Sequence, residues 1–197
     1  MENIKTEELK KLMKIEGKVR GAVFQTDLKY VLEKGGENGL KKLEKRLKDL
    51  GFAIDYRGAK ALDWYPIGQR IISLLVIKEL FNLSDQKIRE MGSLAPKFSF
   101  IVKFLFKVFH PIKKLVREIP RFWKEHYTIG ELEVTKFDEE KKEIIIHLKG
   151  IKLVPLFCYY LEGFFESVLR FIEIKARAQE TKCANKGDPY HEYYLNW

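Results

Sequence analysis

The sequence predicts an α+β fold in which a helical N-terminal part packs on an antiparallel sheet and the chain ends in a β-β-α-β-β unit. Up to about residue 127, apolar residues recur at spacings of three and four, which is typical of amphipathic helices. Beyond that point, alternating and Ile-rich runs predict strands, and a helix that begins at Pro155 separates two strand pairs. We therefore expect a single domain over 1–197, with a mainly helical portion at 1–127 and a β-β-α-β-β portion at 128–197.

The first helices are delimited by capping residues and glycines. Thr6, followed by two glutamates, predicts a helix start. Residues 18–25 are compatible with a short strand or with a turn into the next helix, which Gly35-Gly36 should end. A leucine-rich amphipathic helix follows and closes at Gly51.

Prolines and glycines also mark the later helices. Residues 63–66 should start a longer helix, with Pro66 near its first turn. Ser84 predicts the cap of the next helix, and Gly92 predicts its end. A further apolar helix is expected over 98–116, kinked or broken by Pro111 inside it.

Four strands and one helix are predicted in the C-terminal portion. The charged segment 138–142 predicts a hairpin turn, and residues 185–189, rich in Asn, Gly, Asp and Pro, predict a second one. The expected elements are strands at 129–137 and 143–148, a helix at 155–172, and strands at 175–183 and 190–197.

Composition narrows the classes of function. Apolar residues make up 46% of the 197 residues, which is enough for a sizeable core, and aromatic residues make up 13%. The aromatic content fits either an aromatic-lined pocket or a Phe-rich core. The net charge is +9, yet the lysines are scattered beside apolar residues at helical spacing, as on solvated helix faces. Nucleic-acid binding is therefore the weakest of the possibilities considered.

Two cysteines do not make a disulfide framework in a chain of 197 residues. The N-terminus lacks the apolar stretch of a signal peptide, and no apolar window reaches the length of a membrane span. We expect a cytoplasmic protein without a membrane span.

A possible metal site surrounds the second hairpin turn. Cys183 and His191 are numbered symmetrically about Gly187, so in a hairpin they should face one another. Glu180 is a further zinc-ligand type nearby, and Cys158 could supply a fourth. Glu180 and Cys183 are three residues apart and would point to opposite faces of an ideal strand, so the site requires a bulge near residue 182. The alternative is two buried thiols with a surface glutamate and a surface histidine.

The C-terminal portion resembles 4-vinyl reductase-type domains. The resemblance rests on Cys158 before a helix that carries Gly163, then Glu180-x-x-Cys183 and the Gly187-Asp188 turn. The family ends this motif with a Cys, where this chain has His191. The resemblance implies a structural zinc ion bound by Cys158, Glu180, Cys183 and His191, which closes the hairpin onto the helix.

The superfamily is also similar to TRAPP transport-complex subunits and to haem nitric-oxide/oxygen-binding domains. It implies a ligand pocket between the helical layer and the sheet, often in a homodimer. In the phenol-type sensors a histidine upstream of the first zinc Cys contacts the ligand, and His110 is roughly placed for that role. The alternative is a helix-end histidine satisfied by backbone or water. Phe106, Trp123 and Tyr127 are the further candidate ligand-binding residues, and an aromatic core is the alternative for Trp123 and Tyr127.

Haem is not expected from the sequence. The haem domains carry a Tyr-x-Ser-x-Arg motif, and the corresponding strand here reads Ile145-x-His147-x-Lys149. The chain also shows no Ser/His/Asp set, phosphate loop or paired-carboxylate motif, so an enzyme is not expected either.

The function predicted from sequence is binding or sensing of a small, largely apolar molecule, with the signal passed to a protein partner or through a dimer. The second hypothesis is a scaffold of the TRAPP type without a regulated ligand. The third is nucleic-acid binding through the basic surface.

Overall fold

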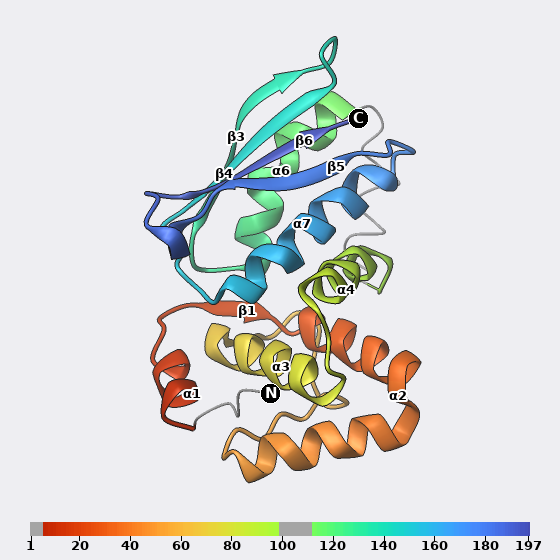
Figure 1. Cartoon of the computed structure of the whole chain (residues 1–197), viewed down its shortest axis with the longest axis vertical. Helices are drawn as coiled ribbons and strands as arrows, with labels where there is room; N and C mark the ends of the chain where they lie inside the picture. The colour runs from red at the N-terminus through yellow and green to blue at the C-terminus, as the bar shows by residue number, and fades with distance from the viewer. Residues whose placement is uncertain (1–5, 99–111) are drawn as a thin grey trace. The chain divides into compact units, whose positions relative to one another are not determined.

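The computed structural model describes residues 6–98 and 112–197. The chain groups into two compact units, residues 1–87 and 88–197, which are described one at a time. Figure 1 shows the elements of both units in order along the chain. His110 and Phe106 lie outside the described residues, as does most of the helix expected over 98–116.

The first unit is a small helical body with a two-stranded ribbon. Helices α1 and α2 pack against α3, and β1 pairs with β2 in antiparallel register with Val19 opposite Tyr65. Buried Leu, Ile and Val residues of α2 and α3 fill its core. Its elements are α1 (Thr6–Met13), β1 (Lys18–Arg20), α2 (Ala22–Asp49), β2 (Trp64–Pro66) and α3 (Ile67–Leu80).

A fully buried ion pair joins α2 to α3. The Arg70 guanidinium contacts the Asp27 carboxylate, and both side chains are 0% exposed. Ser73 Oγ donates a hydrogen bond of 2.7 Å to the same carboxylate, and Tyr56 Oη lies 2.8 Å from Ser73 Oγ. Removing either charge would leave the other one buried and unpaired, which would destabilise the contact between α2 and α3.

Two boundaries in this unit differ from the sequence prediction. The expected break at Gly35-Gly36 appears as a kink within α2, where Gly36 alone is non-helical with φ 59° and ψ −160°. The helix expected to start at residues 63–66 starts later, because residues 64–66 form strand β2 and α3 begins at Ile67, directly after Pro66. Pairing with β1 holds the backbone before Pro66 extended.

The second unit confirms the predicted α+β class and the terminal β-β-α-β-β order. Its sheet has the strand order β3-β4-β6-β5, and every neighbouring pair is antiparallel. Helix α4 extends across the boundary between the units. The elements are α4 (Asp85–Phe98), α6 (Ile112–His126), β3 (Glu131–Asp138), β4 (Glu143–Lys149), α7 (Pro155–Arg170), β5 (Arg177–Lys182), the short 3-10 helix η1 (Ala184–Lys186) and β6 (His191–Asn196).

The sheet has one buried face. Along β4 the residues Ile144, Ile146 and Leu148 are buried, while the residues between them are half-buried. Helix α7 runs along this face in Figure 1, and Phe165 of α7 meets Tyr193 of β6 edge to face at 5.0 Å. The hydrophobic core of the unit therefore lies between α7 and the sheet.

Gly92 does not end its helix, contrary to the sequence prediction. Helix α4 continues to Phe98, and a Cβ atom on Gly92 would lie 2.0 Å from the carbonyl oxygen of Tyr160. A Cβ atom on Gly163 of α7 would lie 1.8 Å from the carbonyl oxygen of Arg89. The two glycines let α4 and α7 cross with their backbones in contact, which is why neither position carries a side chain.

No helix in the described part of the chain combines the length and the apolar character that a membrane span requires.

Candidate metal centre and adjoining pocket

Four metal-ligating side chains converge at one end of the second unit. One donor atom from each of Cys158, Glu180, Cys183 and His191 lies within 4.8 Å of all the others. Cys158 stands in the first turn of α7, Glu180 lies in β5, Cys183 directly follows β5, and His191 begins β6. Cys158, Cys183 and His191 are buried and Glu180 is half-buried, so the cluster is closed off from bulk solvent.

The strand register explains this convergence. Lys182 pairs with Glu192, which places Cys183 level with His191 across the hairpin, as the numbering about Gly187 predicted. The register shifts between Glu180 and Lys182, and this is the bulge that a metal site required. Because of the bulge, the side chains of Glu180 and Cys183 can lie on the same face of the sheet, although the two residues are three apart.

The hairpin turn is held by its own hydrogen bonds. Gly187 ends η1 in the left-handed region with φ 108°, a conformation that favours glycine. Asp188 Oδ2 accepts a hydrogen bond of 2.7 Å from the backbone N–H of Cys183. The turn therefore holds the backbone of Cys183 in place without a bound ion.

Two distances within the cluster match a tetrahedral ion. The two sulfur atoms lie 3.8 Å apart, and Cys158 Sγ lies 3.7 Å from His191 Nδ1. Zinc bond lengths of about 2.3 Å to sulfur and about 2.0–2.1 Å to nitrogen give tetrahedral edges of roughly 3.8 Å and 3.6 Å. The shorter 2.7 Å contact from His191 Nδ1 to Glu180 Oε1 is a hydrogen bond, which an ion would replace.

The charges of the cluster also favour a cation. Burial raises the pKa of the Cys158 thiol well above its usual range, and the neighbouring Glu180 charge adds to this effect. Burial alone would raise the pKa of Glu180, but hydrogen bonds from His191 and the two thiols outweigh it and hold that pKa below its usual value. A buried carboxylate beside two thiols is a site that a divalent cation would neutralise.

Groups around the cluster orient its members. Asn185 Nδ2 lies 3.4 Å from Cys158 Sγ and can donate to that sulfur. Glu162 of α7 accepts a hydrogen bond of 2.7 Å from the backbone N–H of Glu180. Arg89 of α4 pairs with Glu162 at 2.9 Å and with Glu166 at 2.5 Å. These contacts fix β5 against α7.

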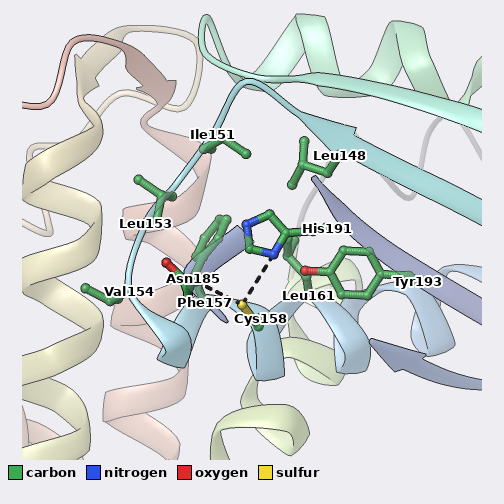
Figure 2. A pocket seen from close by; sticks show the side chains of 10 residues that line it. All are labelled: Leu148, Ile151, Leu153, Val154, Phe157, Cys158, Leu161, Asn185, His191 and Tyr193. Atoms are coloured by element: carbon green, nitrogen blue, oxygen red, sulfur yellow. Dashed lines mark hydrogen bonds between the residues drawn. The ribbon is translucent and has the colours of Figure 1, made fainter. Parts of the chain in front are cut away.

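A small pocket adjoins the cluster, and Figure 2 shows it. Its cavity volume is about 10 Å³, which is room for about one water molecule and far below the roughly 300–1,000 Å³ of ordinary small-molecule sites. Cys158 and His191 belong both to the pocket wall and to the cluster. The complete lining is Leu148, Ile151, Leu153, Val154, Phe157, Cys158, Leu161, Asn185, His191 and Tyr193.

Two of the predicted ligand-binding residues lie beside this pocket rather than in its wall. Trp123 and Tyr127 stack at 4.2 Å, and Trp123 Nε1 donates a hydrogen bond to the Ile129 carbonyl. Tyr127 meets the pocket residue Phe157 edge to face at 6.3 Å. The two rings therefore stack beside Phe157, and a ligand contact by either of them stays a prediction. A ligand contact by His110 or Phe106 stays a prediction, since both lie outside the described residues.

Tyr193, Asn185 and Glu162 are site residues that the sequence analysis missed. Tyr193 could have been found, because it lies two residues after His191 on the same strand and so faces the same side. Asn185 and Glu162 gave no such signal, since their roles depend on how η1 and α7 pack around the hairpin.

No protein-family model matches the chain, and no curated protein matches it either. Several solved structures do. An H-NOX protein from S. oneidensis in the Fe(II)NO state aligns with a TM-score of 0.70 and 13% identity, over 90% of this chain and 98% of that one. A doubly substituted Tt H-NOX aligns with a TM-score of 0.67 and 14% identity, over 90% and 94%. A K. algicida H-NOX variant aligns with a TM-score of 0.62 and 13% identity, over 90% and 95%.

The chain has the H-NOX fold. The similarity predicted to haem nitric-oxide/oxygen-binding domains is thus confirmed at the level of fold. These neighbours do not single out a 4-vinyl reductase-type domain, and they lend no support to the TRAPP-like or nucleic-acid alternatives.

The expectation that haem is unlikely, which rested on the missing motif, is contradicted by these structural neighbours. One further structural neighbour, with a TM-score of 0.64, is described by the modulation of haem redox potential through porphyrin distortion. The H-NOX fold therefore accommodates haem, and a short strand motif is too local a signal to exclude it.

The four-residue cluster itself does not fit haem. Its four donor atoms all lie within 4.8 Å of one another, whereas a haem iron already has four porphyrin nitrogens and leaves at most two positions for protein ligands. On β4, the strand compared with the haem motif, Ile145, His147 and Lys149 occupy half-buried positions that alternate with the buried core residues. His147 there hydrogen-bonds Glu192 at 2.8 Å and stacks on Tyr190.

Proposed function

We propose that this chain is a small-molecule-binding sensor domain in which a divalent metal ion of the zinc type fastens the β5–β6 hairpin to α7. The observation that carries the metal part is the convergence of four donor atoms within 4.8 Å on a closed, hydrogen-bonded hairpin. The sensor part draws on the H-NOX fold.

The donor set favours zinc among the common divalent ions. Two thiolates and an imidazole are soft or borderline ligands, whereas magnesium and calcium prefer oxygen. Four protein ligands complete a tetrahedral shell and leave no position for substrate, which is the arrangement of a structural site. The ion would therefore stabilise the hairpin and would not carry out chemistry.

Elemental mass spectrometry tests the metal site. Protein purified without chelator should contain about one zinc per chain, in line with a single four-ligand site. Cys183→Ala and His191→Ala should each lose most of it. His147→Ala is the matched control, because His147 lies on the same sheet and bonds Glu192 outside the cluster. Metal-free wild-type protein, or equal metal content in both histidine variants, would refute the site.

The protein partner and the homodimer also belong to this proposal, and the family resemblance supports them. Light scattering coupled to size exclusion should give about twice the 23.3 kDa chain mass. A mass equal to one chain at all accessible concentrations would remove the dimer from the proposal.

The second candidate is a haem-based sensor, and the fold favours it. Haemin titrated into metal-loaded protein should then give a Soret band that saturates near one haem per chain. The band should change in His110→Ala and not in His147→Ala. A titration without a saturating band would leave the metal centre and its pocket as the basis of function.

A further inference from the structure

We propose that the outward side of α6 is a docking surface for an acidic helix of a protein partner. This surface, called the basic stripe, consists of Lys113, Lys114, Arg117, Arg121 and Lys124. The inference deepens the proposed function by giving the chemistry of the partner to which the sensor passes its signal, and it rests on that function in this respect alone.

The first observation is that the lysines and arginines of α6 gather on one side of the helix. At about 3.6 residues per turn, the five side chains fall within roughly 100° of the helix circumference and extend over about 17 Å. All five are exposed. Glu118 and Glu125 border the stripe on one side only. The lysines are scattered along the sequence, yet on α6 the helical period brings the basic residues into one continuous surface.

The second observation is that the chain neutralises this surface only in part. Arg121 pairs with Glu118 at 2.8 Å and with Glu125 at 3.2 Å. Lys113 pairs with Glu139 at 3.1 Å, and both of these side chains are more than half exposed. Ion pairs at such exposure are weak, so they do not compete strongly with an acidic partner. The cations without an ion-pair partner among the described residues are Lys114, Arg117 and Lys124.

The opposite side of α6 argues against a membrane as the partner. Helices that lie on a membrane surface insert their apolar side into the lipid. The apolar side of α6 is packed inside the protein instead, where the helix contacts β3. Its buried residues are Ile112, Leu115, Val116, Ile119 and Trp123.

The exposed side chains favour a protein over a nucleic acid. Throughout α6, which is fully described, the exposed side chains are lysine, arginine and glutamate, with no aromatic ring or amide to stack on bases or read them. The carboxylates of Glu118 and Glu125 would repel a continuous row of phosphates. A protein helix can place acidic residues opposite the stripe and a basic residue opposite these two glutamates. Mixed charge of this kind is matched by a protein surface.

Packing also connects α6 to the first turn of α7. Trp123, on the buried side of α6, stacks on Tyr127 at 4.2 Å, and Tyr127 meets Phe157 edge to face at 6.3 Å. Phe157 directly precedes Cys158, a member of the four-residue cluster. A partner docked on the basic stripe is therefore joined to the cluster through three packed rings.

Amide NMR of the isotopically labelled chain tests the docking surface. The probe is an alanine-rich helical peptide whose five glutamates repeat the spacing of the five cations, and a second peptide carries glutamine at those positions. The glutamate peptide should shift the amide signals of α6 and saturate, while the glutamine peptide should leave them unchanged. Arg117→Glu combined with Lys124→Glu should bind the glutamate peptide about tenfold more weakly, because two attractions become repulsions.

Lys41→Glu combined with Lys48→Glu is the matched control, because it makes the same change in net charge at exposed lysines of α2. This control should bind the glutamate peptide like the wild type. The inference is overturned if the control loses as much affinity as the α6 variant, or if the glutamate peptide shifts no signal of α6. It is also overturned if phosphatidylserine vesicles or a DNA duplex bind α6 more tightly than the peptide does at the same ionic strength.

Zinc content is measured on the same samples. Peptide binding by a chain without zinc would reject the metal proposal and leave the docking surface intact. Zinc in a chain that ignores the peptide would reject the docking surface alone.

Discussion

At the scale of single residues, Gly163 and Gly92 determine how closely two helices approach. In each case a carbonyl oxygen of the opposing helix occupies the space that a Cβ atom would need, at 1.8 Å and 2.0 Å respectively. A methyl group there cannot be accommodated by turning a side chain, because the obstacle is backbone.

We predict that Gly163→Ala lowers the free energy of unfolding by about 3 kcal/mol, as overpacking at a backbone contact does. The matched control is Gly39→Ala in α2, where the nearest obstacle is the Phe81 ring at 3.3 Å. It should stay within about 1 kcal/mol of the wild type, because alanine improves helix propensity. Urea denaturation of both variants provides the comparison. Equal losses of unfolding free energy in the two variants would show that the backbone contact at Gly163 does not determine how closely α4 and α7 pack.

The cluster residues differ in how far the sequence could predict them. Cys183 and His191 follow from symmetry about the Gly187 turn, and the strand register agrees with it. Glu180 required a bulge whose position depends on how β6 pairs with β5, which local sequence does not encode. Cys158 is 25 residues away from Cys183 and joins the cluster only because α7 packs on the sheet.

At the scale of elements, an acidic pair on α7 fastens an edge strand. Glu162 and Glu166 accept hydrogen bonds from the backbone of β5, at Glu180 and Ala178. Arg89 neutralises both carboxylates and is only 18% exposed. Burial raises the pKa of Glu162 above its usual value even with Arg89 beside it.

We predict that Arg89→Leu destabilises the protein by about 3 kcal/mol near neutral pH, because two carboxylates lose their buried partner. Without Arg89 the folded-state pKa of Glu162 rises further above its unfolded value. Stability from such a group is present at low pH and is lost as pH rises through the folded pKa. The difference in unfolding free energy between Arg89→Leu and the wild type should therefore shrink as pH falls from about 7 to about 5.

Thermal unfolding at several pH values measures this, with Arg121→Leu as control because Arg121 forms exposed pairs within α6. A deficit that is independent of pH would mean that Arg89 acts by packing alone.

At the scale of the whole molecule, all four proposed metal ligands lie in the second compact unit. An ion bound there stabilises the folded hairpin, because it binds the folded state and not the unfolded one. It does not directly stabilise the helices of the first unit. We predict that a strong chelator speeds amide hydrogen exchange in β5, β6 and the first turn of α7, while α2 and α3 keep their protection.

Hydrogen exchange read by mass spectrometry tests this on the metal-loaded chain. Metal-loaded His147→Ala should reproduce the wild-type pattern, and His191→Ala should resemble the chelated protein without chelator. Loss of protection spread evenly over α2, α3 and the hairpin would contradict a local structural site.

Patterns within short stretches of sequence determined the class of fold, the order of the C-terminal strands and helix, and the donor types around the Gly187 turn. These features can be predicted because amphipathic periodicity, helix capping and turn formation each depend on only a few neighbouring residues. Only the tertiary structure decided that Gly92 lies at a helix crossing, that Trp64–Pro66 pairs as a strand, and that Tyr193 lines a pocket. Each of these depends on which distant segment packs opposite, and packing between segments far apart in the chain leaves no periodic trace in the sequence.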